Sequence, residues 1–184
     1  MAKLEVLKYP EKSLKEPSEP VKEVTEEHRQ LFQDMIETMY LSHGLGLAAP
    51  QVGLNITLFV MDVARPNPLD EENPISNPLC LINPKIIEKS DETIIYEEGC
   101  LSCPDLLVDV KRSKAVVVEA LNEKGELITH NFTELEAVCA QHEMDHLQGT
   151  LLTDQISRLK RELYRKKRMR LKKEEEESFD SNLL

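Results

Sequence analysis

The sequence predicts an α+β fold, in which antiparallel β-sheets pack around a central metal-binding helix, with an N-terminal helix and a C-terminal basic helix. Segments with strand composition cluster between helical segments, and gaps of hairpin length separate most of them. Short gaps favour antiparallel pairing, because parallel neighbours need a long crossover connection. The segment 133–149 has a helical pattern that is apolar on nearly every face, as expected for a helix in the core.

The composition is that of an acidic globular protein, with 184 residues, 40% apolar residues and a formal net charge of −11. This length is sufficient for one domain with a substantial core. The sequence shows neither an apolar run long enough to span a membrane nor the apolar segment of a secretory signal. We therefore expect a cytoplasmic protein whose four cysteines serve a metal site or catalysis rather than a disulfide framework.

The N-terminal part is expected to hold a short strand at 3–7, a proline-rich arm at 9–20 and then a helix. Thr25 is a good N-cap for this helix, since its hydroxyl can accept a hydrogen bond from a backbone N–H of the first turn. The helix is expected to end at Gly44. Its predicted buried stripe is Leu31, Met35, Ile36 and Met39.

The central part is rich in strand patterns. A glycine-rich turn at 44–53 leads into a strand at 56–63, and a loop with several prolines follows at 64–78. Further strands are predicted at 79–88, 92–97, 106–111, 114–121 and 126–131. Asn122–Gly125 is a typical hairpin turn, so the last two strands are expected to pair.

The segment 133–149 is predicted to be a helix with both ends marked. Thr133 is a suitable N-cap, and Glu136 three residues later would complete a capping box. Gly149 stands where a left-handed residue commonly ends a helix. Because most positions between these residues are apolar, a site on this helix would lie deep in the protein.

This helix contains the pattern H-E-x-x-H, formed by His142, Glu143 and His146. Residues four apart share one face of a helix, so both imidazoles can bind one metal ion. Glu143 lies beside that face, where a general base acting on a water molecule at the metal is expected. The simpler alternative is a core helix whose two histidines are satisfied by ordinary hydrogen bonds.

A catalytic metal site needs a third protein ligand and one open position, and the best candidate ligand is Cys100, in the segment 97–103. A thiolate beside a divalent metal is deprotonated and binds it strongly. A closed structural site that also uses Cys103 is the alternative, but the cysteine and histidine pairs lie farther apart than in a zinc finger. We therefore interpret Cys103 as a small core residue, and the same holds for Cys80 and Cys139.

The stretch Gly44–Gln51 offers a second functional group. Two glycines flank Leu45, two alanines follow, and Gln51 ends the turn, so the backbone can pack closely. A buried glutamine amide can donate a hydrogen bond to a developing oxyanion. The alternative is a glycine turn with a surface glutamine, and the stretch lacks the pattern of a phosphate-binding loop.

The C-terminal part changes character, because residues 158–173 hold ten Lys or Arg and one Glu, a net charge of +9. We expect a catalytic domain at 1–157, followed at 158–184 by a basic helix and an acidic, disordered tail. The basic helix is either a solvated surface or a binding surface for an acidic partner. Its short apolar stripe is predicted to be Ile156, Leu159 and Leu163.

Three stretches together resemble the peptide deformylase family: GLGLAAPQ at 44–51, EGCLS at 98–102 and QHEMDHLQG at 141–149. They stand in the family's order and at similar distances, and the resemblance extends over residues 3–165. It implies a metal-dependent hydrolase that removes the N-formyl group from the initiator methionine of newly made polypeptides and releases formate.

The resemblance also implies a role for each matching residue. Glu143 would be the general acid and base, while the Gln51 amide and the backbone N–H of Leu101 would donate hydrogen bonds to the oxyanion. The metal would be Fe²⁺, which Zn²⁺, Ni²⁺ or Co²⁺ can replace. The implied metal ligands are Cys100, His142 and His146. The implied substrate-binding residues are Gly44, Leu45, Gly46, Tyr96, Leu135, Val138 and Cys139.

Other positions match or depart from the family pattern. Glu98 and Arg112 stand at positions that brace the metal loop, as an ion pair. Leu107 stands where many bacterial members carry an Arg or another polar residue that contacts the substrate chain. Asp105 replaces a frequent Gly, and Cys103 replaces an aliphatic residue. These departures concern contacts with the substrate chain rather than the chemistry.

The partners implied by the resemblance are nascent formyl-Met polypeptides and, through Arg158–Lys173, the ribosome surface. We expect neither a membrane nor sequence-specific nucleic acid as a partner. Two other classes remain open, because a zinc peptidase and a non-catalytic metal-stabilised binding module can carry the same histidine pattern.

Overall fold

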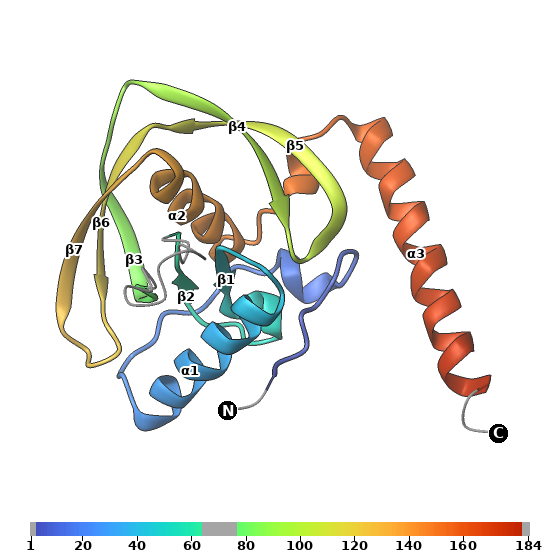
Figure 1. Cartoon of the computed structure of the whole chain (residues 1–184), viewed down its shortest axis with the longest axis horizontal. Helices are drawn as coiled ribbons and strands as arrows, with labels where there is room; N and C mark the ends of the chain where they lie inside the picture. The colour runs from blue at the N-terminus through green and yellow to red at the C-terminus, as the bar shows by residue number, and fades with distance from the viewer. Residues whose placement is uncertain (1–2, 64–76, 182–184) are drawn as a thin grey trace, which may run out of the picture.

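The structure, a computed structural model, describes residues 3–63 and 77–181 of the chain (Figure 1). Its helices are α1 (Glu26–Leu41), α2 (Glu134–Leu147) and α3 (Arg158–Ser181), with short 3-10 turns at Lys12–Lys15, Ala49–Val52 and Leu152–Asp154. Its strands are β1 (Gly46–Ala48), β2 (Leu58–Met61), β3 (Leu79–Lys89), β4 (Thr93–Cys100), β5 (Cys103–Ser113), β6 (Ala115–Leu121) and β7 (Leu127–Thr133). The proline-rich loop predicted at 64–78 lies almost entirely outside the described residues.

The strands form two antiparallel sheets, which confirms the predicted α+β fold. Within the described residues, one sheet has the order β1-β2-β3-β6-β7, and β4 pairs with β5 in a second, two-stranded sheet. Figure 1 shows α2 at the centre, between the larger sheet and the arch formed by β4 and β5. The predicted hairpin turn joins β6 to β7, since the N–H of Gly125 donates to the carbonyl of Asn122 at 3.0 Å.

The core is built around β2, which is buried on both faces. Phe59 and Met61 belong to the apolar cluster around α2, whereas Leu58 and Val60 belong to the cluster around α1. Two-sided burial explains the uniformly apolar sequence of this strand, because alternate residues point to opposite faces. The stripe predicted for α1 packs into the second cluster: Leu31, Met35, Ile36 and Met39.

Helix α2 follows β7 without a loop, and Thr133 is both the last residue of β7 and the N-cap. The predicted capping box with Glu136 is wrong, because the Thr133 side chain makes no capping hydrogen bond. The chain turns instead at Glu134, which has a φ of 50° and donates its N–H to the carbonyl of Lys114 at 2.8 Å. Gly149 has a φ of 71°, as predicted, and lies so close to neighbouring backbone that no Cβ would fit.

Three local predictions in the N-terminal half are wrong. Residues 3–7 belong to neither sheet. Strand β1 lies inside the stretch predicted to be only a glycine-rich turn, and Leu47 is its residue opposite Val60 of β2. Helix α1 ends at Leu41, before the predicted Gly44. A strand as short as β1 cannot show the alternating pattern from which strands are predicted.

Helix α3 is anchored to the N-terminal arm by an aromatic ring and a guanidinium. The ring of Tyr164 stacks on that of Tyr9, with their centroids 5.8 Å apart, and its hydroxyl donates to the carbonyl of Pro104 at 2.8 Å. Arg168, which is 6% exposed, donates from Nε to the carbonyl of Tyr9 at 3.4 Å. One side of α3 is therefore packed against the body of the protein.

The rest of α3 differs from the prediction in two respects. The apolar stripe is wrong at Leu159 and Leu163, which are 72% and 59% exposed. The helix also continues through the acidic run at 174–177 to Ser181, where a disordered tail was expected. None of the described helices is both long enough and apolar enough to cross a membrane.

Candidate active site

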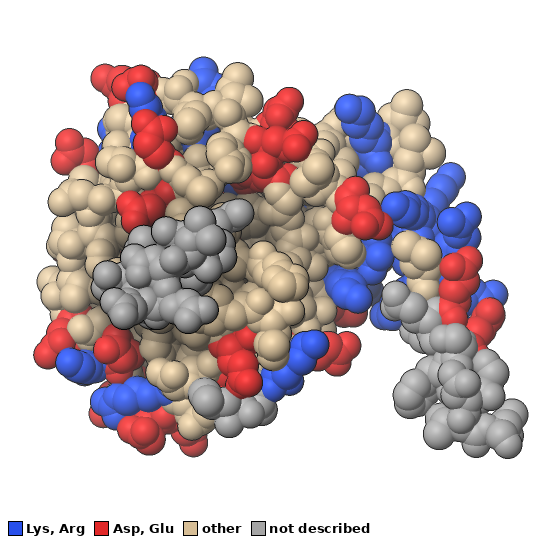
Figure 2. Space-filling view, viewed as in Figure 1, with Lys and Arg blue, Asp and Glu red and all other residues tan. Residues whose placement is uncertain are grey.

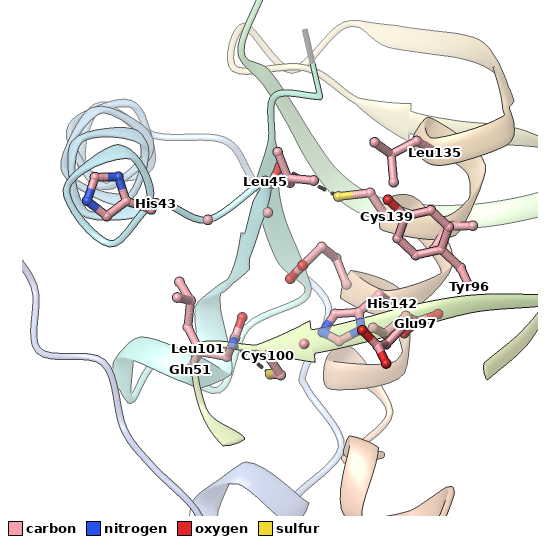
Figure 3. A pocket seen from close by; sticks show the side chains of 16 residues that line it. His43, Leu45, Gln51, Tyr96, Glu97, Cys100, Leu101, Leu135, Cys139 and His142 are labelled. Carbon is pink, nitrogen blue, oxygen red and sulfur yellow. Dashed lines mark hydrogen bonds and ion pairs between the residues drawn. The ribbon is translucent and has the colours of Figure 1, made fainter. Parts of the chain in front are cut away.

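A cavity of about 450 Å³ lies between β1, β4 and α2, and it contains residues from all three motif stretches. Figure 3 shows Gln51, Cys100 and Leu101 on one side of the cavity and Leu45, Leu135, Cys139 and Tyr96 on the other. Every residue expected to bind substrate lines it: Gly44, Leu45, Gly46, Tyr96, Leu135, Val138 and Cys139. The cavity is therefore polar at one end and mainly apolar at the other.

Cys100, His142 and His146 converge at the polar end. Their candidate ligand atoms lie within 4.8 Å of one another, and Cys100 Sγ is 3.2 Å from His146 Nε2. Cys100 is the last residue of β4, whereas both histidines belong to α2, so the cluster forms only when sheet and helix pack together. Within the described residues, Cys103 is not a member of this cluster, which argues against the closed four-ligand site.

The donor set fits a divalent transition metal, because one thiolate and two imidazoles suit both Zn²⁺ and Fe²⁺. Burial lowers the pKa of His146 well below its usual value, which keeps this imidazole in the neutral form that binds metals. Three protein ligands leave a further coordination position for a small molecule, as catalytic sites require. The cluster is therefore more than a core helix with two satisfied histidines.

Glu98 and Arg112 hold the candidate metal ligands in place. Glu98 Oε2 lies 2.8 Å from His142 Nδ1, which leaves the other ring nitrogen of His142 for a metal. Arg112 donates to both oxygens of Glu98, at 2.8 Å and 2.9 Å, so the expected ion pair is present. Arg112 also donates to Asp145 Oδ2 at 2.6 Å, and Asp145 is a member of this network that the sequence analysis missed.

These contacts determine which groups carry charge. Burial opposes ionisation of Glu98, but hydrogen bonds from Arg112 and His142 outweigh it and lower the pKa of Glu98. Burial also opposes a charge on His142, yet its hydrogen bond to Glu98 and the nearby Glu143 raise the pKa of His142. The negative groups around His142 thus favour a cation at this position, either a proton or a metal ion.

Glu143 forms part of the cavity wall and is only 4% exposed. Burial raises the pKa of Glu143 to about 7, close to the value at which a carboxyl group can both accept and release a proton in neutral solution. Its carboxylate lies against Gly46, where a Cβ atom would overlap it. Gly46 therefore allows β1 to approach α2 closely enough to bury Glu143.

The Gln51 amide is held next to the metal cluster. Its Oε1 accepts the backbone N–H of Ala48 at 2.8 Å, and its Nε2 donates to Ser102 Oγ at 3.1 Å. The same Nε2 lies 3.6 Å from Cys100 Sγ. Gln51 is 2% exposed, so the alternative of a surface glutamine is wrong. These contacts point the amide N–H groups toward the end of the cavity where the candidate ligand Cys100 lies.

Three lining residues were not selected from the sequence: His43, Glu97 and Gly99. His43 has a φ of 55°, so the chain turns sharply just before the glycine stretch. Each of the three is adjacent to a selected residue, and this adjacency was the only signal that the sequence offered. Leu107 is 63% exposed and does not line the cavity. Its side chain lies beside Gly99, which does line the cavity.

Comparisons with known proteins agree with this geometry. The family model for polypeptide deformylase matches residues 3–162. A peptide deformylase of Pseudoalteromonas translucida is 47% identical over 167 residues, which cover 91% of this chain and 95% of the relative. A solved peptide deformylase from Legionella pneumophila has a TM-score of 0.82 at 34% identity, covering 95% of this chain and 98% of that chain. Another, from Ehrlichia chaffeensis in complex with actinonin, has a TM-score of 0.83 at 37% identity, covering 91% and 96%.

We expect a divalent metal to bind at the cluster, and the ligands and their supporting carboxylate to contribute differently. Cys100→Ser and His146→Ala should each abolish stoichiometric binding, because a direct ligand is removed. Glu98→Gln should weaken binding by about 10- to 100-fold, since Glu98 orients His142 and is not itself a candidate ligand. The measurement is competition with a chromogenic chelator.

Glu88→Gln is the matched control, because it makes the same change to an exposed carboxylate that lies on β3, outside the cavity lining. Its affinity for the metal should equal that of the unchanged protein. Stoichiometric binding that persists in both Cys100→Ser and His146→Ala would contradict the three-ligand site.

Proposed function

Because this chain belongs to the peptide deformylase family, we propose specific roles for its cavity residues in the hydrolysis of N-formylmethionyl peptides. The enzyme removes the N-formyl group from the initiator methionine of newly made polypeptides and releases formate. The observation that carries the proposal is the placement of a buried, acid–base-competent Glu143 beside the cluster of Cys100, His142 and His146.

In this proposal the three clustered residues hold the metal ion of the enzyme. A divalent cation held by these residues would supply a Lewis acid, able to polarise the formyl carbonyl and to make nearby water easier to deprotonate. Glu143 accepts a proton as water adds to the formyl carbon. Glu143 then delivers that proton to the amine nitrogen as the carbon–nitrogen bond breaks, so one carboxyl group serves as base and then as acid.

The oxygen of the formyl group gains negative charge when water adds to the carbon, and two N–H donors would stabilise it. One is the amide of Gln51, which Ala48 and Ser102 hold in a fixed orientation. The other is the backbone N–H of Leu101, in the turn that follows Cys100. Donors fixed before the reaction need no reorganisation, which is the main advantage of such a site.

The apolar end of the cavity would bind the methionine side chain. Leu45 and Cys139 contact each other there, with Cys139 Sγ 3.6 Å from the carbonyl of Leu45. Leu135, Val138 and Tyr96 complete this surface. The chain at Gly44–Leu47 would exclude an acetyl methyl group while leaving room for the hydrogen of a formyl group, which gives selection by size.

Glu143→Gln should retain the metal but lose activity, because the amide has nearly the same shape and cannot accept the proton. We expect a loss of about 10²- to 10⁴-fold or more in kcat, the usual contribution of a general acid or base. The measurement is formate release from a formyl-Met tripeptide, together with the metal content. Glu88→Gln again serves as the control and should remain active, while loss of metal in Glu143→Gln would contradict the assigned role.

We propose Fe²⁺ as the native metal, with Zn²⁺, Ni²⁺ or Co²⁺ able to replace it. Thiolate and imidazole suit all of these ions, so the ligands alone do not select iron. With iron bound, activity should decay in air, since both Fe²⁺ and the Cys100 thiolate can be oxidised. Nickel-substituted enzyme should decay more slowly in the same time course. Fully active zinc enzyme from anaerobic purification, indifferent to oxygen, would contradict iron as the native metal.

We also propose that α3 brings the enzyme to the ribosome, in the cytoplasm where formylated chains emerge. Figure 2 shows Lys and Arg side chains gathered along α3, whereas acidic side chains are spread over the rest of this face. A positive helix on an acidic protein would be attracted to the phosphates of ribosomal RNA, without reading sequence. Among residues 158–174, only Tyr164 and Arg168 are buried, so most of the cations in this part of the helix are exposed to solvent.

Replacing Arg158, Lys160 and Lys166 by Gln should weaken ribosome co-sedimentation and leave hydrolysis of a small formyl peptide unchanged. These three residues are exposed, and substitution is preferable to deletion because it keeps Tyr164 in place. The slope of the logarithm of the binding constant against the logarithm of the salt concentration should fall in magnitude by about one for each replaced cation that contacts phosphate. A control with Lys85, Lys89 and Lys124 replaced by Gln makes the same change in net charge, and equal sedimentation of both variants would contradict the proposal.

A further inference from the structure

A second cysteine lies directly opposite the candidate metal ligand Cys100. Cys100 ends β4 and Cys103 begins β5, and the two residues are register partners across the turn formed by Leu101 and Ser102. Directly opposed residues of an antiparallel pair have Cα atoms about 4.5–5.5 Å apart. A disulfide requires about 4.4–6.8 Å. Both thiols are free, and they are close enough to share a hydrogen bond.

The two thiols differ in how an oxidant can reach them. Cys100 lines the active-site cavity and is only partly buried. Cys103 is 1% exposed and is enclosed in the apolar cluster of Tyr9, Leu14 and Tyr164, against which Cys100 also packs. A small oxidant that enters the cavity therefore meets Cys100 first. Cys103 stays reduced and lies within reach of the oxidised sulfur.

We propose that Cys103 is a resolving thiol, which captures oxidised Cys100 as a Cys100–Cys103 disulfide and so makes oxidation of the site reversible. The oxidant is a hydroperoxide. The Cys100 sulfur attacks one peroxide oxygen, the O–O bond breaks, and sulfenic acid and water form when hydrogen peroxide is the reagent. The Cys103 sulfur then attacks the Cys100 sulfur, the S–O bond breaks, and the oxygen leaves as water with the remaining proton.

The overall step removes two electrons and two protons from the thiols and converts hydrogen peroxide into two molecules of water. Without a partner thiol, sulfenic acid is open to further oxidation to sulfinic and sulfonic acids, which ordinary thiol reductants do not reverse. With Cys103 beside it, the sulfur is held at an oxidation state that a dithiol can reduce. The effect on activity rests on the proposed role of Cys100 as metal ligand, whereas disulfide formation itself does not.

The test uses zinc-loaded enzyme, because zinc has no redox chemistry and any oxidation is then that of the protein. Unchanged enzyme, Cys103→Ala and Cys80→Ala are treated with hydrogen peroxide. Cys80→Ala is the matched control, since Cys80 is also a buried core cysteine, 4% exposed, but lies on β3. Each sample is examined by intact mass, by peptide mapping without reduction, by zinc release to a chromogenic chelator, and by activity before and after dithiothreitol and added zinc.

The unchanged enzyme and Cys80→Ala should lose the mass of two hydrogen atoms, give a peptide linked through Cys100 and Cys103, release zinc and recover activity after reduction. Cys103→Ala should gain the mass of oxygen atoms on Cys100 and recover little activity. Sulfinic acid on Cys100 of the unchanged enzyme, with no linked peptide, would overturn the proposal even if Cys103→Ala did not fold. Failure of the untreated enzyme to bind zinc would instead count against the proposed metal site. It would leave the test of the disulfide intact, because the mass and mapping results do not depend on zinc binding.

Discussion

The buried ion pair between Glu98 and Arg112 is the constraint on which the candidate metal site depends. The candidate ligands come from two separate elements, since β4 carries Cys100 and α2 carries both histidines. Arg112 of β5 bonds to Glu98 of β4 and to Asp145 of α2, so one guanidinium fixes the position of the helix against the small sheet. Loss of one partner would leave a buried charge unpaired, at a cost of about 3–5 kcal/mol.

The burial that this ion pair requires also determines the chemistry of the cavity. Glu98 remains charged because Arg112 and His142 bind it, whereas Glu143, equally buried but without such partners, has its pKa raised. Two carboxyl groups of similar exposure are therefore suited to different roles, one to orient a candidate ligand and the other to move protons. Gly46 makes the environment of Glu143 possible, because a side chain at position 46 would displace Glu143.

Sequence reasoning succeeded where spacing along one element determines geometry. His142, Glu143 and His146 lie on one helix, so their relative positions follow from the helical period. It did not find Asp145, because its partner Arg112 is brought near only by packing between β5 and α2. The capping box failed for a related reason, since pairing with β6 holds Thr133 in a strand up to the first turn of the helix. Contacts between residues far apart in the sequence thus determine both features, and local sequence patterns do not reveal such contacts.

Helix α3 shows how one segment can be basic and solvated and still support the site. Tyr164 packs with Tyr9, Leu14 and Leu151 around Cys103, behind the turn that places Cys100 in the cavity. The first half of α3 thus belongs to the packing that holds the β4–β5 turn in place. A boundary at residue 157 therefore marks a change in charge along the chain and does not separate two packed units. Because only Tyr164 and Arg168 are buried among the residues from 158 to 174, the helix can hold the turn and still present its cations to solvent.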